Sequence, residues 1–289
     1  MTQHKYHLDK SSKKFNCPSC DEKRFVKCIE TETGQYADGQ YGRCDRETKC
    51  GYFTYPNSQT AHYGYVSRAK PPVETSYIAN ELQLRSLSDY EKNPLVKYLV
   101  RCFSKEKVEH VIRKYQVGTS KEYDGSTVFY QIDTKMRVRT GKIMGYDEAT
   151  GKRSKGGGYS NITWVHTILN LPEYNLSQCL FGLHLLNETT KRVTIVESEK
   201  TALFMSLELP QHTWMATGSL RGFKYEYLAS VMNCEIIAFP DKGGYEDWQK
   251  TATALNKQGF NIAVINLLEE PQYEDGWDLI DILQYEDTK

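Results

Sequence analysis

The chain has 289 residues, of which 39% are hydrophobic and 26% charged, and 37 basic residues balance 37 acidic ones. This is an ordinary globular composition with room for two or three domains of ~100–200 residues each. No apolar run approaches the ~18 residues of a membrane span, and the first residues lack the apolar segment of a secretory signal. We therefore expect a cytoplasmic protein, whose eight cysteines suit metal binding better than disulfides.

The zero net charge conceals an uneven distribution along the chain. Residues 1–72 carry 12 basic and 8 acidic side chains, and residues 97–160 carry 14 and 7. Residues 186–289 carry 9 basic and 17 acidic side chains. A basic front and an acidic back predict polyanion binding by the first and cation binding by the second. The alternative is solvated surface charge without a partner.

Two cysteine pairs lie in the first sixty residues. Predicted strands at Arg24–Glu30 and around Gln40–Arg43 lie between the pairs, which have internal gaps of two and five residues. The four cysteines are Cys17, Cys20, Cys44 and Cys50. A hairpin that brings them together makes a tetrahedral four-thiolate site, the geometry that zinc prefers. We therefore predict a zinc ribbon whose metal supplies much of the folding free energy, since the module is too short for a large core.

The remaining cysteines lie among apolar residues and carry no catalytic signature, because a nucleophilic thiol needs a positioned base. We interpret all four as core residues: Cys28, Cys102, Cys179 and Cys234. Residues 61–74 are polar and contain prolines, which is typical of a linker.

The middle of the chain, about residues 75–185, combines predicted helices and strands. Apolar residues at helical spacing predict a helix over residues 93–103. Ser104 is a suitable N-cap for a second helix that ends near Tyr115. Strands are predicted over Thr127–Asp133 and Met136–Met144 because these segments are rich in β-branched and aromatic residues.

Basic side chains gather on the second of these strands and on the loop after it. Arg137 and Arg139 are two residues apart and share one face, and Lys142 continues the stripe with an offset at Gly141. The loop adds three basic residues before a run of glycines: Lys152, Arg153 and Lys155. We predict that these six side chains bind nucleic-acid phosphates or a nucleotide, although the loop is not a Walker A motif. A solvated outer face of a sheet is the alternative.

Residues 186–289 alternate regularly between strands and helices. The predicted strands are Arg192–Val196, Thr213–Ala216, Glu235–Phe239 and Asn261–Ile265, and the predicted helices are 198–207, 224–232 and Tyr245–Lys257. This alternation predicts a parallel sheet flanked by helices. Ligands of such sheets bind at the carboxyl ends of the strands, where Glu197 and Asp241 fall.

Acidic residues recur after the last predicted strand, at Asp278 and Asp281. Carboxylates gathered at one point need a cation to stay ionised together. Oxygen ligands suit Mg²⁺ or Mn²⁺, so we predict a divalent-metal site that includes Glu197 and Asp241. For Glu197, a helix cap at the end of a strand is the alternative.

The segment Val193–Ala202 resembles the first motif of the TOPRIM fold, which DnaG-type bacterial primases, topoisomerases and some nucleases share. Ile236–Asp241 is similar to the strand that carries the family's Asp-x-Asp, and Asp278–Asp281 resembles the later Asp-x-x-Asp of primase-type members. The cysteine module is similar to the zinc-binding domain before the primase core, and the middle is similar to the basic subdomain before TOPRIM. The whole chain looks most like small primase-like proteins of bacterial mobile elements.

One position departs from the family pattern. Gly243 stands where the resemblance implies the second aspartate of Asp-x-Asp. A two-metal site needs enough carboxylates for both ions. The site therefore holds one ion, uses Asp278 or Asp281 instead, or is catalytically weak or inactive.

The resemblance implies a primase that polymerises short RNA primers from NTPs on single-stranded DNA. Glu197 and Asp241 are then catalytic and hold Mg²⁺ or Mn²⁺ with Asp278 and Asp281, while the basic residues bind template or nucleotide. A replicative helicase or another replication protein of a mobile element or phage is an expected partner. A non-catalytic DNA-binding adaptor and a metal-dependent TOPRIM-type nuclease are the alternatives, because a fold does not fix a function.

The expected architecture is α/β in three parts. A four-cysteine zinc ribbon covers residues 1–60 and a linker covers residues 61–74. A basic α+β, primase-like subdomain covers residues 75–185, and a TOPRIM-like parallel sheet flanked by helices covers residues 186–289.

Overall fold

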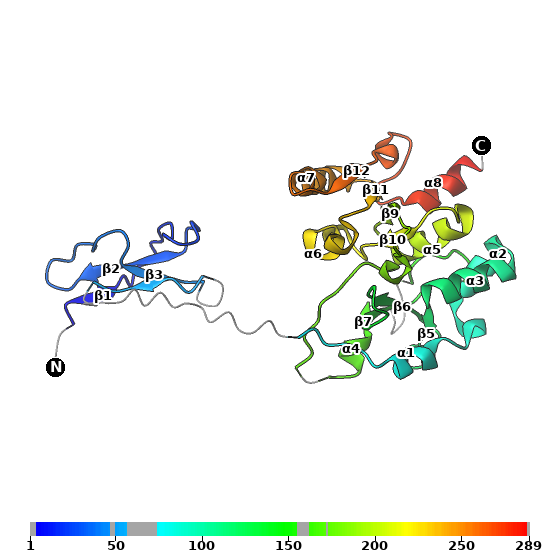
Figure 1. Ribbon diagram of the computed structural model, residues 1–289, viewed down its shortest axis with the longest axis horizontal. Coiled ribbons are helices and arrows are strands. Elements are labelled where there is room, and N and C mark those ends of the chain that lie inside the picture. The colour runs from blue at the N-terminus through cyan, green and yellow to red at the C-terminus, as the bar shows by residue number, and fades with distance from the viewer. Residues whose placement is uncertain (1–3, 47–49, 57–73, 155–161, 172, 288–289) are drawn as a thin grey trace. The chain divides into compact units, whose positions relative to one another are not determined.

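The computed structural model describes residues 4–46, 50–56, 74–154, 162–171 and 173–287. The chain forms two compact units, Met1–Glu74 and Thr75–Lys289 (Figure 1). All of the predicted linker except Glu74 lies outside the described residues. A division of the second unit at residue 185 stays a prediction.

The first unit is a four-stranded antiparallel sheet in the order β1-β2-β3-β4. Its strands are β1 (Tyr6–Leu8), β2 (Phe25–Glu30), β3 (Gly42–Cys44) and β4 (Phe53–Thr54). The two strands predicted between the cysteine pairs are therefore confirmed as β2 and β3. Among the described residues of this unit, the buried cluster around the cysteines consists of Cys17, Phe25 and Cys44, with partly buried aromatic and cysteine neighbours. Cys28 is fully buried within β2, as expected for a core residue.

The second unit begins with helices, and the two predicted over residues 93–103 and from Ser104 to about Tyr115 are present as α2 (Pro94–Cys102) and α3 (Lys105–Tyr115). They follow α1 (Asn80–Ser86) and the 3-10 turn η1 (Tyr90–Lys92). The Asn93 side chain accepts hydrogen bonds from the first turn of α2, and Ser104 accepts one from the N–H of Lys107 at the start of α3. These bonds satisfy backbone donors that have no partner within the helix. Cys102 is exposed, so its assignment to the core is wrong.

An antiparallel sheet in the order β5-β6-β7-β8 follows. Its strands are β5 (Gly118–Thr119), β6 (Thr127–Ile132), β7 (Val138–Met144) and β8 (Thr163–Trp164), and the short helix α4 (Val165–Ile168) comes next. Gln131 pairs with Thr140 and Ile132 pairs with Val138, which leaves Arg139 as an extra residue in β7. A bulge of this kind changes which side chains face each side of the sheet beyond it.

A parallel sheet in the order β10-β9-β11-β12 forms the rest of the unit. Its strands are β9 (Arg192–Val196), β10 (Trp214–Ala216), β11 (Glu235–Phe239) and β12 (Asn261–Val264). Its helices are α5 (Glu199–Glu208), α6 (Tyr225–Leu228), α7 (Tyr245–Asn256) and α8 (Leu279–Glu286), with 3-10 turns at Leu183–Leu185, Leu220–Gly222, Ala229–Val231 and Leu267–Glu269. The predicted helix over 224–232 is thus α6 followed by a 3-10 turn, and α8 was not predicted.

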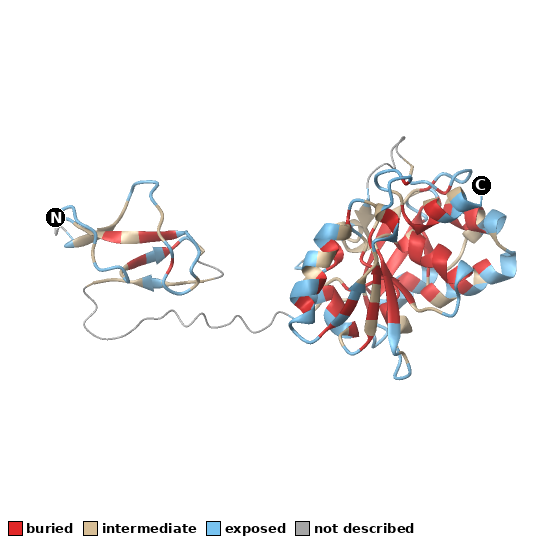
Figure 2. Ribbon diagram, turned by 90° about the horizontal axis from the view of Figure 1, so that it is seen from above, coloured by how far each residue is buried: buried red, intermediate tan, exposed pale blue. Residues whose placement is uncertain are grey.

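Strands β9 and β10 of the parallel sheet are buried on both faces, whereas residues of β11 and β12 alternate between buried and less buried positions (Figure 2). Residues of α5 and α8 pack with α2 and α3 on one face, and residues of α6 and α7 pack on the other. Burial on both sides explains the continuous apolar runs of β9 and β10. Phe129 of β6 lies in the same cluster as Val196 of β9, so the two sheets share a core. In the described part of the chain, no helix has the length and apolar character needed to cross a membrane.

Candidate metal centre and acidic pocket

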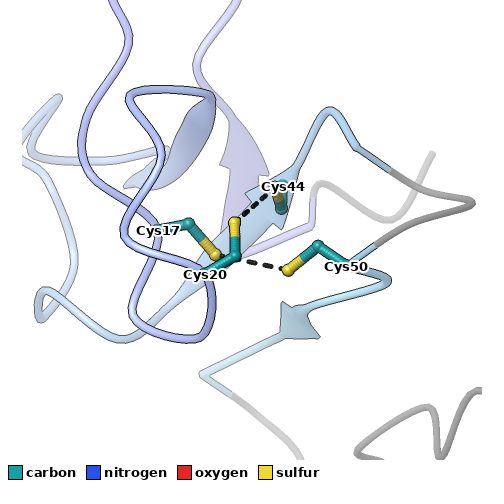
Figure 3. A group of neighbouring side chains, drawn as sticks. All are labelled: Cys17, Cys20, Cys44 and Cys50. Atoms are coloured by element: carbon teal, nitrogen blue, oxygen red, sulfur yellow. Dashed lines mark hydrogen bonds between the residues drawn. The ribbon is translucent and has the colours of Figure 1, made fainter. Parts of the chain in front are cut away.

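The four predicted cysteines come together from the segment before β2, the end of β3 and the loop after it (Figure 3). Their sulfur atoms all lie within 4.8 Å of one another, with 3.7 Å between Cys17 Sγ and Cys50 Sγ and 3.9 Å between Cys20 Sγ and Cys44 Sγ. A tetrahedron of thiolates around zinc, with Zn–S bonds of about 2.3 Å, has edges of about 3.8 Å. The sulfur positions therefore fit a four-cysteine zinc-binding site.

The thiols of this cluster cannot all ionise without a cation. Burial raises the pKa of Cys44 to about 12. Burial also works against ionisation of Cys50, but hydrogen bonds from the Tyr52 N–H and the neighbouring thiols bring its pKa to about 7. One thiolate therefore forms readily and the next form only with a metal present, so zinc binding releases protons.

A pocket of about 500 Å³ lies in the second unit where the parallel and antiparallel sheets meet. Among the described residues, its lining includes four acidic and three basic side chains: Glu197, Glu199, Asp241, Asp278, Lys142, Lys200 and Arg153. The acidic side chains come from the carboxyl ends of β9 and β11 and from the starts of α5 and α8. Lys142 and Arg153 come from the antiparallel sheet and the loop after it.

Glu197 follows β9 directly and faces the pocket. Burial raises the pKa of its carboxyl group, while a hydrogen bond from the Leu220 N–H and the charge of Lys142 oppose that rise. The Glu197 carbonyl accepts a hydrogen bond of 2.8 Å from the Gly218 N–H. The loop after β10 therefore donates hydrogen bonds to both the side chain and the carbonyl group of Glu197.

Asp241 follows β11 and faces the same pocket. Burial, together with the charges of Glu197 and Asp278, raises its pKa to about 8 against the opposing charge of Lys200. In the described part of the chain, no donor forms a hydrogen bond with the Asp241 carboxylate. An acid held next to other acids without a donor is suited to binding a cation.

Asp278 lines the pocket but is also the N-cap of α8. One of its oxygens accepts hydrogen bonds from the N–H groups of Ile280 and Asp281, and the other accepts one of 2.6 Å from Thr201 Oγ1. Asp281 completes a capping box by accepting a hydrogen bond from the Asp278 N–H. Burial and the charge of Asp278 raise the pKa of Asp281. Both residues thus have a structural use besides the predicted metal binding.

The one-residue offset in β7 lies at Arg139 rather than at Gly141, so Thr140 pairs with Gln131 and Lys142 pairs with Phe129. The buried ammonium group of Lys142 lies 3.1 Å from Glu199 Oε2 and donates a 2.7 Å hydrogen bond to the Gly218 carbonyl. Lys142 therefore lies in the acidic pocket, with other partners than Arg137 and Arg139.

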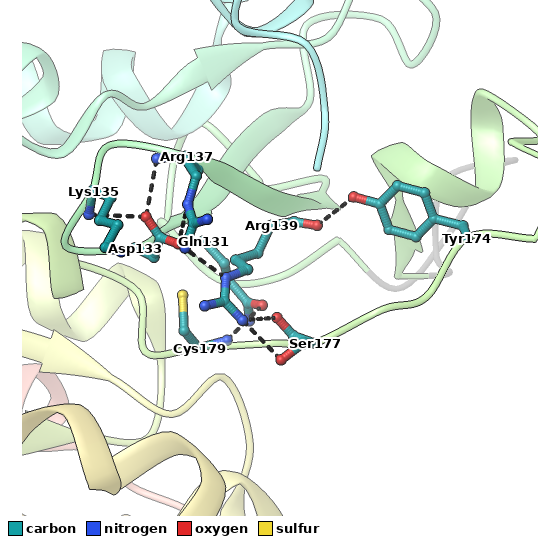
Figure 4. A network of polar contacts seen from close by, with 8 residues as sticks. All are labelled: Gln131, Asp133, Lys135, Arg137, Arg139, Tyr174, Ser177 and Cys179. Carbon is teal, nitrogen blue, oxygen red and sulfur yellow. Dashed lines mark hydrogen bonds and ion pairs between the residues drawn. The ribbon is translucent and has the colours of Figure 1, made fainter. Parts of the chain in front are cut away.

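The other predicted basic residues are dispersed. Arg153 lines the pocket, Lys152 is exposed, and Lys155 lies outside the described residues. Arg137 and Arg139 both bond to the buried Asp133 carboxylate (Figure 4), with 2.8 Å between Arg137 Nη2 and Asp133 Oδ2. Although burial opposes ionisation, hydrogen bonds from Arg137 hold the pKa of Asp133 below its usual value. The two arginines therefore stabilise a turn away from the acidic pocket.

Gly243 has a φ of +89° in the loop after β11, and a Cβ built at this residue meets no atom within 4 Å. Its N–H donates a 3.0 Å hydrogen bond to Glu269 Oε1, which also accepts from the Tyr245 N–H. The Lys242 ammonium group donates to the Glu270 and Tyr273 carbonyls. The loop is thus fixed by the segment after β12 and contributes Asp241 as its one acidic side chain.

Sequence reasoning missed two charged pocket residues in the first turn of α5, Glu199 and Lys200. They follow Glu197 so closely that the turn of the helix brings them to the same end of the sheet. The signal that could have found Glu199 is its spacing of two residues from Glu197 at the start of a helix.

Comparisons with known proteins give two family matches. A model of the family described as Domain of unknown function (DUF6371) matches residues 93–242, and a model described as a zinc beta-ribbon finger matches residues 4–64. A search of curated proteins finds no match.

Several solved structures are similar to this one. The primase fragment of the bacteriophage T7 primase-helicase protein is 17% identical, with a TM-score of 0.45 over 95% of this chain and 97% of that one. The RNA polymerase domain of Mycobacterium tuberculosis primase DnaG is 15% identical, with a TM-score of 0.49 over 71% and 77%. The Aquifex aeolicus primase, with zinc-binding and RNA polymerase domains, is 15% identical, with a TM-score of 0.41 over 96% and 77%.

Proposed function

The chain belongs to the family described as Domain of unknown function (DUF6371), and we propose that this member is a primase-like nucleotidyltransferase. In this proposal it joins ribonucleotides into short primers on single-stranded DNA in the replication of a mobile element or phage. The observation that carries the proposal is the composition of the acidic pocket, where carboxylates at strand ends face basic side chains of a second sheet. Phosphoryl transfer needs this combination of cation ligands and phosphate-binding cations.

The pocket residues divide into two roles. Glu197 and Asp241 hold Mg²⁺ or Mn²⁺, and Asp278 and Asp281 are further candidate ligands from α8. Held by these carboxylates, a divalent ion would supply Lewis-acid chemistry, polarising the phosphate and activating the attacking hydroxyl group. Arg153, at the edge of the pocket, binds the triphosphate or the template backbone, and exposed Lys152 extends this basic surface.

The first unit supplies the template contact in this proposal. This unit exposes Phe53 of β4 and Tyr36 of the segment between β2 and β3, and Lys13 lies 5.4 Å from the centre of the Tyr36 ring. Aromatic rings flanked by cations suit unpaired bases and their phosphates. Single-stranded DNA and NTPs are therefore the proposed ligands, and a replicative helicase or another replication protein is a proposed partner.

A primer-synthesis assay tests the proposal. Zinc-loaded protein is incubated with circular single-stranded DNA, labelled NTPs and Mg²⁺ or Mn²⁺, and products are resolved on a denaturing gel. We expect oligoribonucleotides of a few residues that depend on template and on divalent cation. A complete absence of labelled oligomers under every cation condition rules the proposal out.

Conservative variants connect that activity to the pocket. Glu197→Gln and Asp241→Asn each remove one charge with little change in size, and we expect each to lower product formation by about 100-fold or more. Asp247→Asn, an exposed position in the first turn of α7, is the matched control and should leave synthesis unchanged. Equal loss in all three variants indicates a general folding defect and removes the support for catalysis in this pocket.

Gly243 favours one second candidate, a non-catalytic DNA-binding adaptor on the same scaffold. It predicts salt-sensitive binding to single-stranded DNA that persists in Glu197→Ala without primer synthesis. Fluorescence anisotropy at several salt concentrations measures this binding. Metal-dependent nicking of plasmid DNA in parallel reactions would instead identify a nuclease.

A further inference from the structure

The acidic side chains of the pocket differ in what already binds them. Two have strong partners within the chain, namely Glu199 and Asp278. The Asp241 carboxylate has no hydrogen-bond donor among the described residues, and Glu197 receives one backbone N–H from Leu220. The two least engaged carboxylates therefore stand at the carboxyl ends of neighbouring strands β9 and β11.

Glu199 is neutralised by a lysine from the other sheet. The Glu199 side chain is 3% exposed and that of Lys142 is 6% exposed, and their charged atoms lie 3.1 Å apart. Lys142 also bonds to the Gly218 carbonyl, and a Cβ at Gly218 would approach Glu199 Oε1 to 2.9 Å. The absence of a side chain at Gly218 thus leaves room for the ion pair beside the pocket.

Asp278 is neutralised by its own surroundings. Thr201 Oγ1 and two N–H groups of α8 donate to its oxygens, and the Lys200 ammonium group lies 3.8 Å from Oδ2. A carboxylate with this many donors gains little from an additional cation, because its charge is already stabilised by hydrogen bonds.

We propose that the pocket takes a single divalent cation, held by Glu197 and Asp241, and that the Lys142 ammonium group stands in for a second one. The inference rests on the proposed function and narrows it. Four carboxylates and the three basic side chains of the lining leave an excess negative charge that one divalent ion more than balances. A second ion would need a further carboxylate ligand, which Gly243 does not supply. The Lys142 ammonium group places a positive charge near Glu197 without such a ligand.

Counting bound Mn²⁺ tests the stoichiometry directly. Zinc-loaded full-length protein is titrated with Mn²⁺, and free ion is followed by electron paramagnetic resonance. We expect one Mn²⁺ per chain, and Asp241→Asn should weaken its binding at least about tenfold because a direct ligand is lost. Two equivalent ions per chain overturn the proposal.

The variant Asp278→Asn tests whether Asp278 is a metal ligand or only the N-cap of α8. Asparagine caps a helix about as well as aspartate, so α8 should persist. We expect this variant to bind one Mn²⁺ at least about tenfold more tightly than Asp241→Asn does, since only a nearby charge is removed and not a ligand. Equal weakening in the two variants makes Asp278 a ligand and overturns the assignment to Glu197 and Asp241.

Removing Lys142 should create a second site. Lys142→Gln frees the Glu199 carboxylate beside Glu197, and we expect a second, weaker Mn²⁺ that disappears again in Lys142→Gln/Glu199→Gln. One ion in both variants overturns the role given to Lys142. Because these titrations need no primer synthesis, a chain that binds one Mn²⁺ and makes no primers contradicts the proposed function and leaves this inference standing.

Discussion

The two units of the chain are stabilised in different ways. The first unit has four short strands and a buried cluster built around cysteines. The second unit has two extended apolar clusters on the faces of a parallel sheet. A small module cannot bury enough apolar surface to offset the loss of chain entropy, whereas a unit of about 200 residues can. Metal ligation thus stabilises the small unit, and the packing of apolar side chains stabilises the large one.

The difference extends to how each unit presents charged groups. In the first unit the thiols that bind the metal are also the centre of the fold, so function and stability depend on the same atoms. In the second unit the acidic pocket lies beside the core, and Asp241 can be changed without opening a cavity. Four substitutions test this contrast, and each is expected to change the stability of the chain by a different amount.

Removing a zinc ligand should have the largest effect. Cys44→Ser is expected to release the zinc and unfold the first unit, since structural zinc contributes about 10 kcal/mol or more to the folding of such modules. The second unit should keep its melting temperature. Metal analysis and differential scanning calorimetry measure the two outcomes. Cys28→Ala, a buried position outside the sulfur cluster, should retain one zinc per chain.

Truncating an aromatic residue in the second unit should come next. Phe129 is fully buried and contacts the rings of Phe181 and Tyr146 edge to face. Phe129→Ala should lower the free energy of unfolding by about 3–5 kcal/mol through the cavity it leaves. Zinc content should stay unchanged, and Leu84→Ala at an exposed position should cost less than about 0.5 kcal/mol. Loss of zinc in Phe129→Ala would show that the units depend on each other.

A single buried hydroxyl group should have a smaller effect. Tyr115 Oη donates to the Trp214 carbonyl and pairs with Ser206 Oγ, both at 2.7 Å. Tyr115→Phe leaves these groups without that partner and should cost about 1–3 kcal/mol in denaturant unfolding. Tyr225→Phe, with a half-exposed ring, is the control. A cost equal to the control means that water replaces the lost hydroxyl group.

The smallest expected change is a gain in stability. Asp241 has a pKa of about 8 in the folded chain and an ordinary value of 3.8. Between these values the folded chain binds more protons than the unfolded chain, so stability falls as the pH rises from about 4 to about 8. Without added divalent cation, Asp241→Asn should therefore be more stable than the parent at pH 8 by about 1–2 kcal/mol, a figure reduced for solvent in the pocket.

The same variant supplies its own contrast. The gain from Asp241→Asn should vanish at about pH 3, below the ordinary pKa of 3.8, where the parent carboxyl group is largely protonated in both states. Mn²⁺ at pH 8 should stabilise the parent more than the variant, because the variant binds the ion more weakly. Thermal melts at the two pH values measure both effects, and a gain independent of pH would mean that ionisation of Asp241 is not its source.

Local pattern was sufficient to predict most elements of the fold. The cap at Ser104, the helix over residues 93–103, the strands before Glu197 and Asp241, and the four-cysteine cluster all depend on neighbouring residues or on known metal geometry. The burial of exposed Cys102 was mispredicted because apolar sequence neighbours do not determine which face of a helix a residue lies on. Helix α8 was missed because its start lies within an acidic segment that was interpreted only as a possible metal ligand.

The pocket itself was harder to predict because it depends on contacts between distant segments. The bulge in β7 lies at Arg139 rather than at Gly141, and no residue type in β7 marks that position. The partner of Lys142 is 57 residues away in α5. Pairing over such a distance follows from tertiary packing, which the spacing of residues along one strand does not record.

The packing of α8 against the first helices of the second unit has a consequence for synthesis. Gln284 Nε2 donates a 2.7 Å hydrogen bond to Tyr98 Oη, across 186 residues, and Leu279, Ile280 and Ile282 complete the same core as α2 and α3. At about 5–20 residues per second, roughly 10–40 s separate the translation of these partners. The first unit can fold during that interval. The apolar faces of α2 and α3 that pack against α8 remain uncovered by it until synthesis ends, and chaperones can bind them.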